Sequence, residues 1–146
     1  RNATEALNLI TYSYALENLK PGDEIVISIM EHHANLVTWQ YAAEKTGATL
    51  RYLYIDDNKE IPWSEVEEKV TAKTKILAIT QSSNVLGTMP EVKKIIAHLR
   101  KVNPEGIAVV DGAQAAPHMP VDVKDLDCDF YVFSGHKMLA AMGAGA

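Results

Sequence analysis

The chain has 146 residues, which suits a single domain, and its composition of 47% hydrophobic and 23% charged residues is ordinary for a globular protein. The formal net charge of −5 argues against a partner held mainly by its phosphates, so we do not expect nucleic-acid binding. No run of about 18 apolar residues predicts a membrane span. The single cysteine, Cys128, cannot form an internal disulfide, and no signal-peptide pattern is present, so the sequence predicts a cytoplasmic protein.

Apolar spacing predicts strands and helices in alternation along the chain. Short β-branched or aromatic runs predict strands at residues 24–29, 50–55, 76–80, 107–110 and 130–133. Residues at helical spacing predict helices over residues 5–18, from 35 to 47, from 64 onward and from 90 onward. Asn35 and Ser64 are expected to cap the second and third helices, and Pro90 to open the fourth. This alternation predicts one α/β domain over residues 1–146, with a mainly parallel sheet flanked by helices.

The two ends of the sequence are unusual. The chain begins at Arg1 without an initiator methionine and stops in an apolar, glycine-rich stretch at residues 142–146. We therefore expect these residues to be an incomplete part of a longer chain.

Polar and ionisable groups follow four of the predicted strands. They lie in residues 30–35 (MEHHAN), 81–84 (QSSN), 111–114 (DGAQ) and 134–137 (SGHK). Ligands of parallel sheets bind outside the carboxyl ends of the strands, so these segments are expected to meet there. Loop polarity alone explains any one of them. Together, an aspartate, a lysine, amides, a serine and two histidines suit an anionic, nitrogen-containing aromatic ligand.

Five motifs carry a resemblance to a known family. They are RxxTE at residues 1–5, MEHHAN at 30–35, SNVLGT at 83–88, VDGAQA at 110–115 and DFYVFSGHK at 129–137. In this order they resemble the pyridoxal-phosphate (PLP) core of the cysteine desulfurases, in the SUF-type branch of the class V aminotransferase family. The resemblance covers essentially the whole chain. It implies most of the large domain of the PLP fold-type I architecture, without the smaller C-terminal domain.

The resemblance implies a catalytic role for two residues. Lys137 matches the lysine that forms a Schiff base with PLP. His32 matches the histidine that stacks on the pyridine ring and acts as an acid or base. The neighbouring His33 is expected to be structural. Asp111 matches the carboxylate that keeps the pyridine nitrogen protonated.

The remaining implied cofactor contacts are amide, hydroxyl, imidazole and backbone groups. Asn84 and Gln114 match amides near the phenolic oxygen of the ring. The phosphate contacts that the family implies are Ala3, Thr4, Ser134 and His136. Of these, the Ala3–Thr4 backbone would lie at a helix N-terminus, where free N–H groups favour an anion.

The resemblance also implies an activity. Cysteine desulfurases convert L-cysteine to L-alanine and pass the sulfur, as an enzyme persulfide, to an acceptor protein of iron–sulfur cluster assembly. A homodimer with its active site near the subunit interface is implied. Two alternatives stay open: a selenocysteine lyase or another class V PLP enzyme, and a non-catalytic fragment that keeps the motifs. No metal is expected, because no C-x-x-C or H-E-x-x-H pattern accompanies His32, His33 and Asp111.

Two groups needed for the implied reaction are expected to lie beyond this chain: the catalytic cysteine and the arginine that binds the substrate carboxylate. Cys128 is not expected to replace the cysteine. It stands between Asp127 and Asp129, which predicts a small buried residue with a raised pKa. We therefore expect the isolated 146 residues to be inactive. Ala140 and Ala141 replace the family's usual Gly-Pro, which predicts a different turn after Lys137.

Overall fold

The computed structural model describes residues 1–140 and 142–146, so Ala141 and the turn expected there lie partly outside the described residues. Within this part of the chain, five strands form one sheet in the order β2-β1-β3-β4-β5. The strands are β1 (Glu24–Ser28), β2 (Thr49–Leu53), β3 (Thr74–Thr80), β4 (Ile107–Asp111) and β5 (Phe130–Val132). All neighbouring pairs are parallel, which confirms the predicted sheet.

Helices connect the strands and cover both faces of the sheet. They are α1 (Ala3–Ile10), the π-helical turn η1 (Thr11–Ala15), α2 (Leu16–Asn18), α3 (His33–Thr46), α4 (Trp63–Lys69), α5 (Val92–Val102), α6 (Ala115–His118), α7 (Val123–Leu126) and the 3₁₀ turn η2 (Gly135–Lys137). The expected helix over residues 5–18 is therefore one helical stretch with a wider turn in its middle. The turns α6, α7 and η2 were not predicted, because they are too short to show a period.

Two predicted helix caps are wrong. The cap of α3 is His32, whose Nδ1 accepts the Ala34 N–H at 3.1 Å, whereas Asn35 is buried within the first turn. The cap position of α4 is held by Pro62, so Ser64 lies inside the helix and makes no capping bond. Pro62 has an extended backbone conformation, as is usual for a residue at the cap position, and provides no side-chain hydrogen bond. The fourth helix, α5, also begins later than expected, after Pro90.

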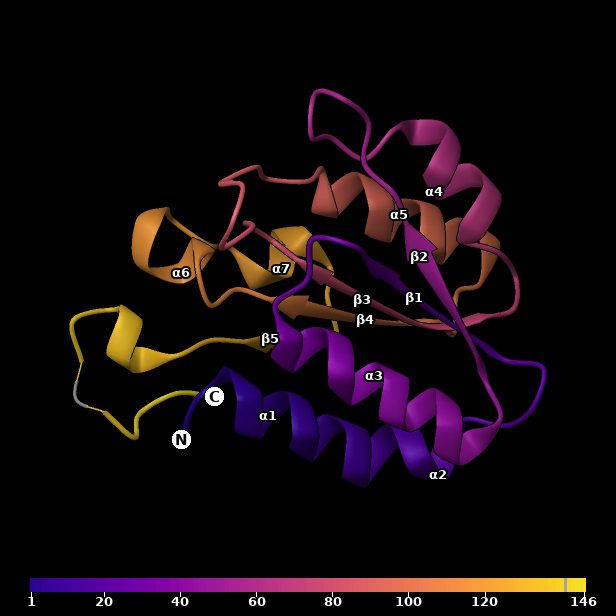
Figure 1. Ribbon diagram of the computed structural model, residues 1–146, viewed down its shortest axis with the longest axis horizontal. Coiled ribbons are helices and arrows are strands. Elements are labelled where there is room, and N and C mark those ends of the chain that lie inside the picture. Colours follow the sequence, from indigo (N-terminus) through magenta and orange to yellow (C-terminus); the bar gives the residue numbers. More distant parts are fainter. Residues whose placement is uncertain (141) are drawn as a thin grey trace.

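Two apolar layers hold the helices against the sheet. In Figure 1, α1 and α3 lie below the sheet, and α4 and α5 lie above it. Leu7 of α1 and Trp39 of α3 are fully buried against Ile27 of β1 on the lower face. On the upper face, Leu99 of α5 is fully buried against Leu77 of β3. No helix of the described residues is long and apolar enough to cross a membrane.

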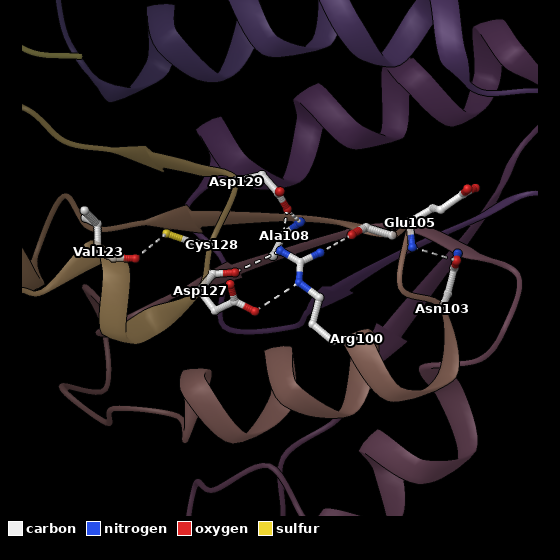
Figure 2. Close-up of polar contacts among 9 residues, drawn as sticks. Arg100, Asn103, Glu105, Ala108, Val123, Asp127, Cys128 and Asp129 are labelled. Carbon is white, nitrogen blue, oxygen red and sulfur yellow. Dashed lines mark hydrogen bonds and ion pairs between the residues drawn. The ribbon is translucent and has the colours of Figure 1, made fainter.

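Arg100, near the end of α5, clamps the amino-terminal edge of the sheet (Figure 2). Its Nη2 donates to Asp129 Oδ2 and to the Asp127 carbonyl, both at 2.8 Å, and its Nε donates to Asp127 Oδ2 at 3.2 Å. Its Nη1 donates to the Gly106 carbonyl. Asp129 Oδ2 also accepts the Ala108 N–H of β4 at 2.7 Å. One side chain therefore joins α5 to the starts of β4 and β5.

We expect Arg100→Ala to lower the free energy of unfolding by about 2 kcal/mol, because several charge-assisted hydrogen bonds are lost together. Urea titration followed by circular dichroism measures this change. The control is Lys93→Ala, whose partner Asp125 lies at 2.5 Å but whose ion pair is 62% and 59% exposed. An exposed pair is expected to contribute less than about 1 kcal/mol. Equal losses in both variants would contradict a clamp at Arg100.

Candidate active site

The carboxyl ends of β1, β3, β4 and β5 meet the N-terminus of α1 around a cavity of about 230 Å³. The cavity is lined by every residue that the sequence predicts as a cofactor contact: Ala3, Thr4, His32, Asn84, Asp111, Gln114, Ser134, His136 and Lys137. Its lining also includes residues that the motif analysis did not single out: Asn2, Ala34, Thr80, Ser82 and Ala113. The fold therefore brings the separate motifs together at one place.

Asp111 is the last residue of β4 and is only 4% exposed. Its Oδ1 accepts the Ala113 N–H at 2.9 Å. Its Oδ2 has no hydrogen-bond partner among the described residues. Burial raises the pKa of Asp111, while the Ala113 N–H and the charges of His32 and Lys137 act to lower it. A cationic ligand group beside Oδ2 would therefore stabilise the ionised carboxylate.

Backbone hydrogen bonds to the segment after β3 and to β5 fix the turn that carries Asp111. The Asp111 carbonyl accepts the Gln81 N–H at 2.9 Å, and the Gly112 N–H donates to the Val132 carbonyl at 2.8 Å. A Cβ atom at Gly112 would lie 2.0 Å from the phenol of Tyr131, so only glycine fits above this ring. The Tyr131 hydroxyl donates to Gln81 Oε1 at 2.7 Å, and burial raises its pKa to about 12, which keeps it a donor.

At the N-terminus of α1, two of the first three helical N–H groups are already bound within the protein. Asn2 Oδ1 accepts the Glu5 N–H at 3.0 Å, and Ser134 Oγ accepts the Ala3 N–H at 2.9 Å. The Thr4 N–H has no acceptor among the described residues. Ala3 lines the cavity as predicted, but its N–H is bound within the protein, so among these groups the Thr4 N–H is the free donor. The Ser134 hydroxyl keeps its own proton for donation.

Lys137 follows β5 in the 3₁₀ turn η2, and its exposed side chain lies at the rim of the cavity. The chain then folds back, because Ser134 forms an antiparallel bridge with Gly145 and the Gly135 N–H donates to the Ala144 carbonyl at 2.7 Å. A Cβ atom at Gly135 would lie 2.7 Å from that carbonyl oxygen, so the close approach requires glycine. This return places the last residues beside the start of α1 (Figure 1).

His32 and His33 differ in their position relative to the cavity. His32 lines the cavity and also a more open groove between α1 and α3, whereas His33 lines that groove and not the cavity; their ring centroids are 6.2 Å apart. Because the Nδ1 atom of His32 accepts the Ala34 N–H, the neutral ring carries its proton on Nε2. No cluster of three His, Cys, Asp or Glu side chains is arranged to hold a metal ion within residues 1–140 and 142–146.

Glu31 is part of the MEHHAN motif, but the motif analysis assigned it no role. It is 9% exposed, and its carboxylate accepts from Ser28 Oγ at 2.5 Å, from Asn35 Nδ2 at 2.6 Å and from the Thr80 N–H at 3.0 Å. Burial raises the pKa of Glu31 to about 7, against the effect of these hydrogen bonds. A lone acidic residue in a run of polar residues gives no sign of burial, so the sequence held no signal for this role.

Cys128 lies at the opposite edge of the sheet, just before β5 and beside the Arg100 clamp (Figure 2). It is half-buried rather than fully buried, because it follows the short helix α7 near the surface. Its Sγ lies 3.9 Å from the Val123 carbonyl. Burial raises the pKa of the thiol, and Asp127 and Asp129 raise it further. The predicted direction of the pKa is confirmed, whereas the predicted full burial is wrong.

Sequence comparison supports the motif assignment. A probable cysteine desulfurase from Halalkalibacterium halodurans is 51% identical over 99% of this chain. A cysteine desulfurase from Haloferax volcanii is 44% identical over the whole chain. The chain covers 35% and 34% of these two proteins, so it spans about a third of the length of the relatives it matches.

Structural comparison confirms the expected fold. The crystal structure of a cysteine desulfurase from Escherichia coli matches 99% of this chain with a TM-score of 0.90 and 41% identity, and the chain covers 36% of that structure. The apo structure of a cysteine desulfurase from Thermococcus onnurineus matches 99% of this chain, with a TM-score of 0.92 and 38% identity. This chain covers 36% of that structure. The profile of the family described as aminotransferase class-V matches residues 1–146. The chain therefore belongs to the aminotransferase class-V family.

Proposed function

We propose that the full-length protein containing this chain is a PLP-dependent cysteine desulfurase. The observation that carries this proposal is the cavity in which Asp111, Lys137 and the N-terminus of α1 converge. The relatives named as cysteine desulfurases support L-cysteine as the substrate. The SUF-type branch stays a prediction from the sequence motifs.

The groups around the cavity fit PLP. The unpartnered Thr4 N–H at the positive end of the α1 dipole suits a phosphate. The free Oδ2 of Asp111 suits a protonated ring nitrogen, and Lys137 supplies a primary amine at the cavity rim. When bound, PLP supplies an electron sink for the substrate. The cavity thus offers one group for each end of the cofactor and one for its covalent attachment.

Asp111 would hold a proton at the ring nitrogen. Its buried position excludes water, which strengthens its interaction with a charged partner. The Ala113 N–H fixes the orientation of the carboxylate, so its second oxygen is directed without any rearrangement. Asn84 and Gln114 also line the cavity, and their side-chain amides would donate to a ring oxygen.

His32 would stack on the ring and move a proton through Nε2. Its Nδ1 is committed to the Ala34 N–H, so Nε2 is the nitrogen left for the substrate. His136 and the Ser134 hydroxyl, both at the cavity, would add contacts to the phosphate.

The thiol that accepts the substrate sulfur would lie outside these 146 residues. Cys128 is at the wrong edge of the sheet and has a raised pKa, which disfavours the thiolate. We further propose a cytoplasmic homodimer that passes sulfur to a carrier protein of iron–sulfur cluster assembly. A selenocysteine lyase would use the same groups of this cavity, and comparing turnover of L-cysteine and L-selenocysteine separates the two activities.

Lys137→Ala is expected to abolish covalent PLP attachment. Lys137 is the lysine among the described residues that line the cavity, and its removal leaves no amine there to form the Schiff base. Borohydride reduction of the full-length protein followed by peptide mass spectrometry locates the adduct. Lys101→Ala, an exposed lysine of α5, serves as the control and should keep it. An adduct found on a different lysine of the native protein would contradict Lys137 as the site of PLP attachment.

Asp111→Asn is expected to lower turnover on the order of a hundredfold or more, because the neutral amide cannot stabilise a charged ring nitrogen. The asparagine oxygen can still accept the Ala113 N–H, so the turn and the covalent attachment of PLP should persist. Steady-state alanine production and the borohydride adduct are measured together. Near-native turnover with PLP attached would contradict the role of the carboxylate.

Cys128→Ser in the full-length protein is expected to leave sulfide release from L-cysteine unchanged. The isolated 146-residue chain, supplied with PLP and reductant, is expected to release none above a PLP-only background, since proximity of the attacking thiol is worth many orders of magnitude in rate. Sulfide and alanine are assayed in parallel. Turnover by the isolated chain that disappears on replacing Cys128 would show that this thiol is the nucleophile.

A further inference from the structure

We propose that Glu31 is a positioning residue of this site, whose carboxylate ties the turn that carries His32 to the end of β3 beside Asp111. The inference rests on the proposed function, since it concerns the same cavity. Glu31 itself does not line that cavity and would act through its neighbours.

The carboxylate of Glu31 joins three elements. Oε1 accepts from Ser28 Oγ at the end of β1 and from the Thr80 N–H at the end of β3. Oε2 accepts from Asn35 Nδ2 in the first turn of α3. Each contact is buried, so a lost bond would leave an unsatisfied polar group away from water. A single side chain therefore fixes how α3 starts relative to two strands.

The contact with Asn35 has a fixed direction. Trp39 is fully buried, and its indole Nε1 can only donate; it donates to Asn35 Oδ1 at 2.7 Å. Asn35 must therefore present its NH₂ group to position 31, where it requires an acceptor. A carboxylate accepts at both oxygens, whereas a glutamine would place a second NH₂ group against one of its donors.

Both ends of this network reach the cavity. His32 directly follows Glu31, and its carbonyl accepts the Asn35 N–H at 2.8 Å. Thr80 lines the cavity and is paired with Asp111 in the register of β3 and β4. Glu31 thus links the turn of His32, which the proposed function stacks on the ring, to the strand end beside Asp111, which it places at the ring nitrogen. A change at position 31 should displace His32 without removing any group that touches PLP.

The test compares Glu31→Gln with the double variant Glu31→Gln/Asn35→Asp in the full-length protein. In the single variant the new NH₂ group at position 31 faces a donor in either orientation, Asn35 Nδ2 or the Thr80 N–H. In the double variant the new amide at position 31 donates to the new carboxylate at position 35, which still accepts from Trp39. The charge is kept but moved by one turn, and every hydrogen bond of the network has a donor and an acceptor.

Two readouts that do not depend on turnover are measured at about pH 8, above the pKa of Glu31. The first is the PLP dissociation constant of the apoprotein, which should rise about tenfold in Glu31→Gln, as expected for one lost buried hydrogen bond. The second is the imidazole nitrogen NMR spectrum of His32 in the apoprotein. The native protein should show the Nε2–H tautomer, and Glu31→Gln a mixture. The double variant should restore both.

Arg100→Ala is the control for general destabilisation, because it loosens the opposite edge of the sheet. It should lower stability without changing PLP affinity or the His32 spectrum. Where Glu31→Gln does not fold, Ser28→Ala removes one donor to the same carboxylate and should give a smaller change in the same direction.

The proposal is overturned if Glu31→Gln leaves both readouts unchanged, or if the folded double variant fails to restore them. It is also overturned if Arg100→Ala changes them equally. A native protein that binds no PLP would refute the proposed function instead, while the His32 spectrum would still test the role of Glu31.

Discussion

All strands of the described sheet run in one direction, and this constraint determines where everything else is placed. Every carboxyl end lies at the same edge, so the segments after β1, β3, β4 and β5 converge although they are far apart in sequence. The opposite edge holds the amino ends and is joined by Arg100. The amino ends of the strands are thus stabilised by the hydrogen bonds of Arg100, and the carboxyl ends surround the cavity.

The open edge contains two buried carboxylates, which are costly to place away from water. Glu31 accepts hydrogen bonds from three donors of three elements, which offset part of the cost of burying its carboxylate. Asp111 has a single donor, from Ala113, and one oxygen left over. Both oxygens of Glu31 accept hydrogen bonds from the protein, which gives this carboxylate a structural role. One oxygen of Asp111 has no such donor among the described residues, so this carboxylate suits a cationic ligand atom. Burial raises the pKa of both.

Close packing below the cavity supports this arrangement. Tyr131 fills the space under Gly112 and hydrogen-bonds to Gln81, so the turn after β4 has little freedom to move. Ser134 binds the first N–H of α1, which joins the end of β5 to the helix that faces it. The site is therefore built on rigid contacts between strand ends rather than on a single mobile loop.

The sequence by itself determined the class of fold and named nine of the residues that line the cavity. Apolar periodicity records which face of each element is buried, so the strands and the buried face of α5 could be predicted, and the motifs named Asp111 and Lys137. Only the tertiary structure decided how polar groups are paired. Asn35 was expected to cap α3 but instead bonds Glu31 and Trp39, and the N–H of Ala3 is taken by Ser134. The reason is physical: a hydrogen bond depends on which donors and acceptors the fold brings within about 3 Å, and partners distant in sequence leave no local pattern.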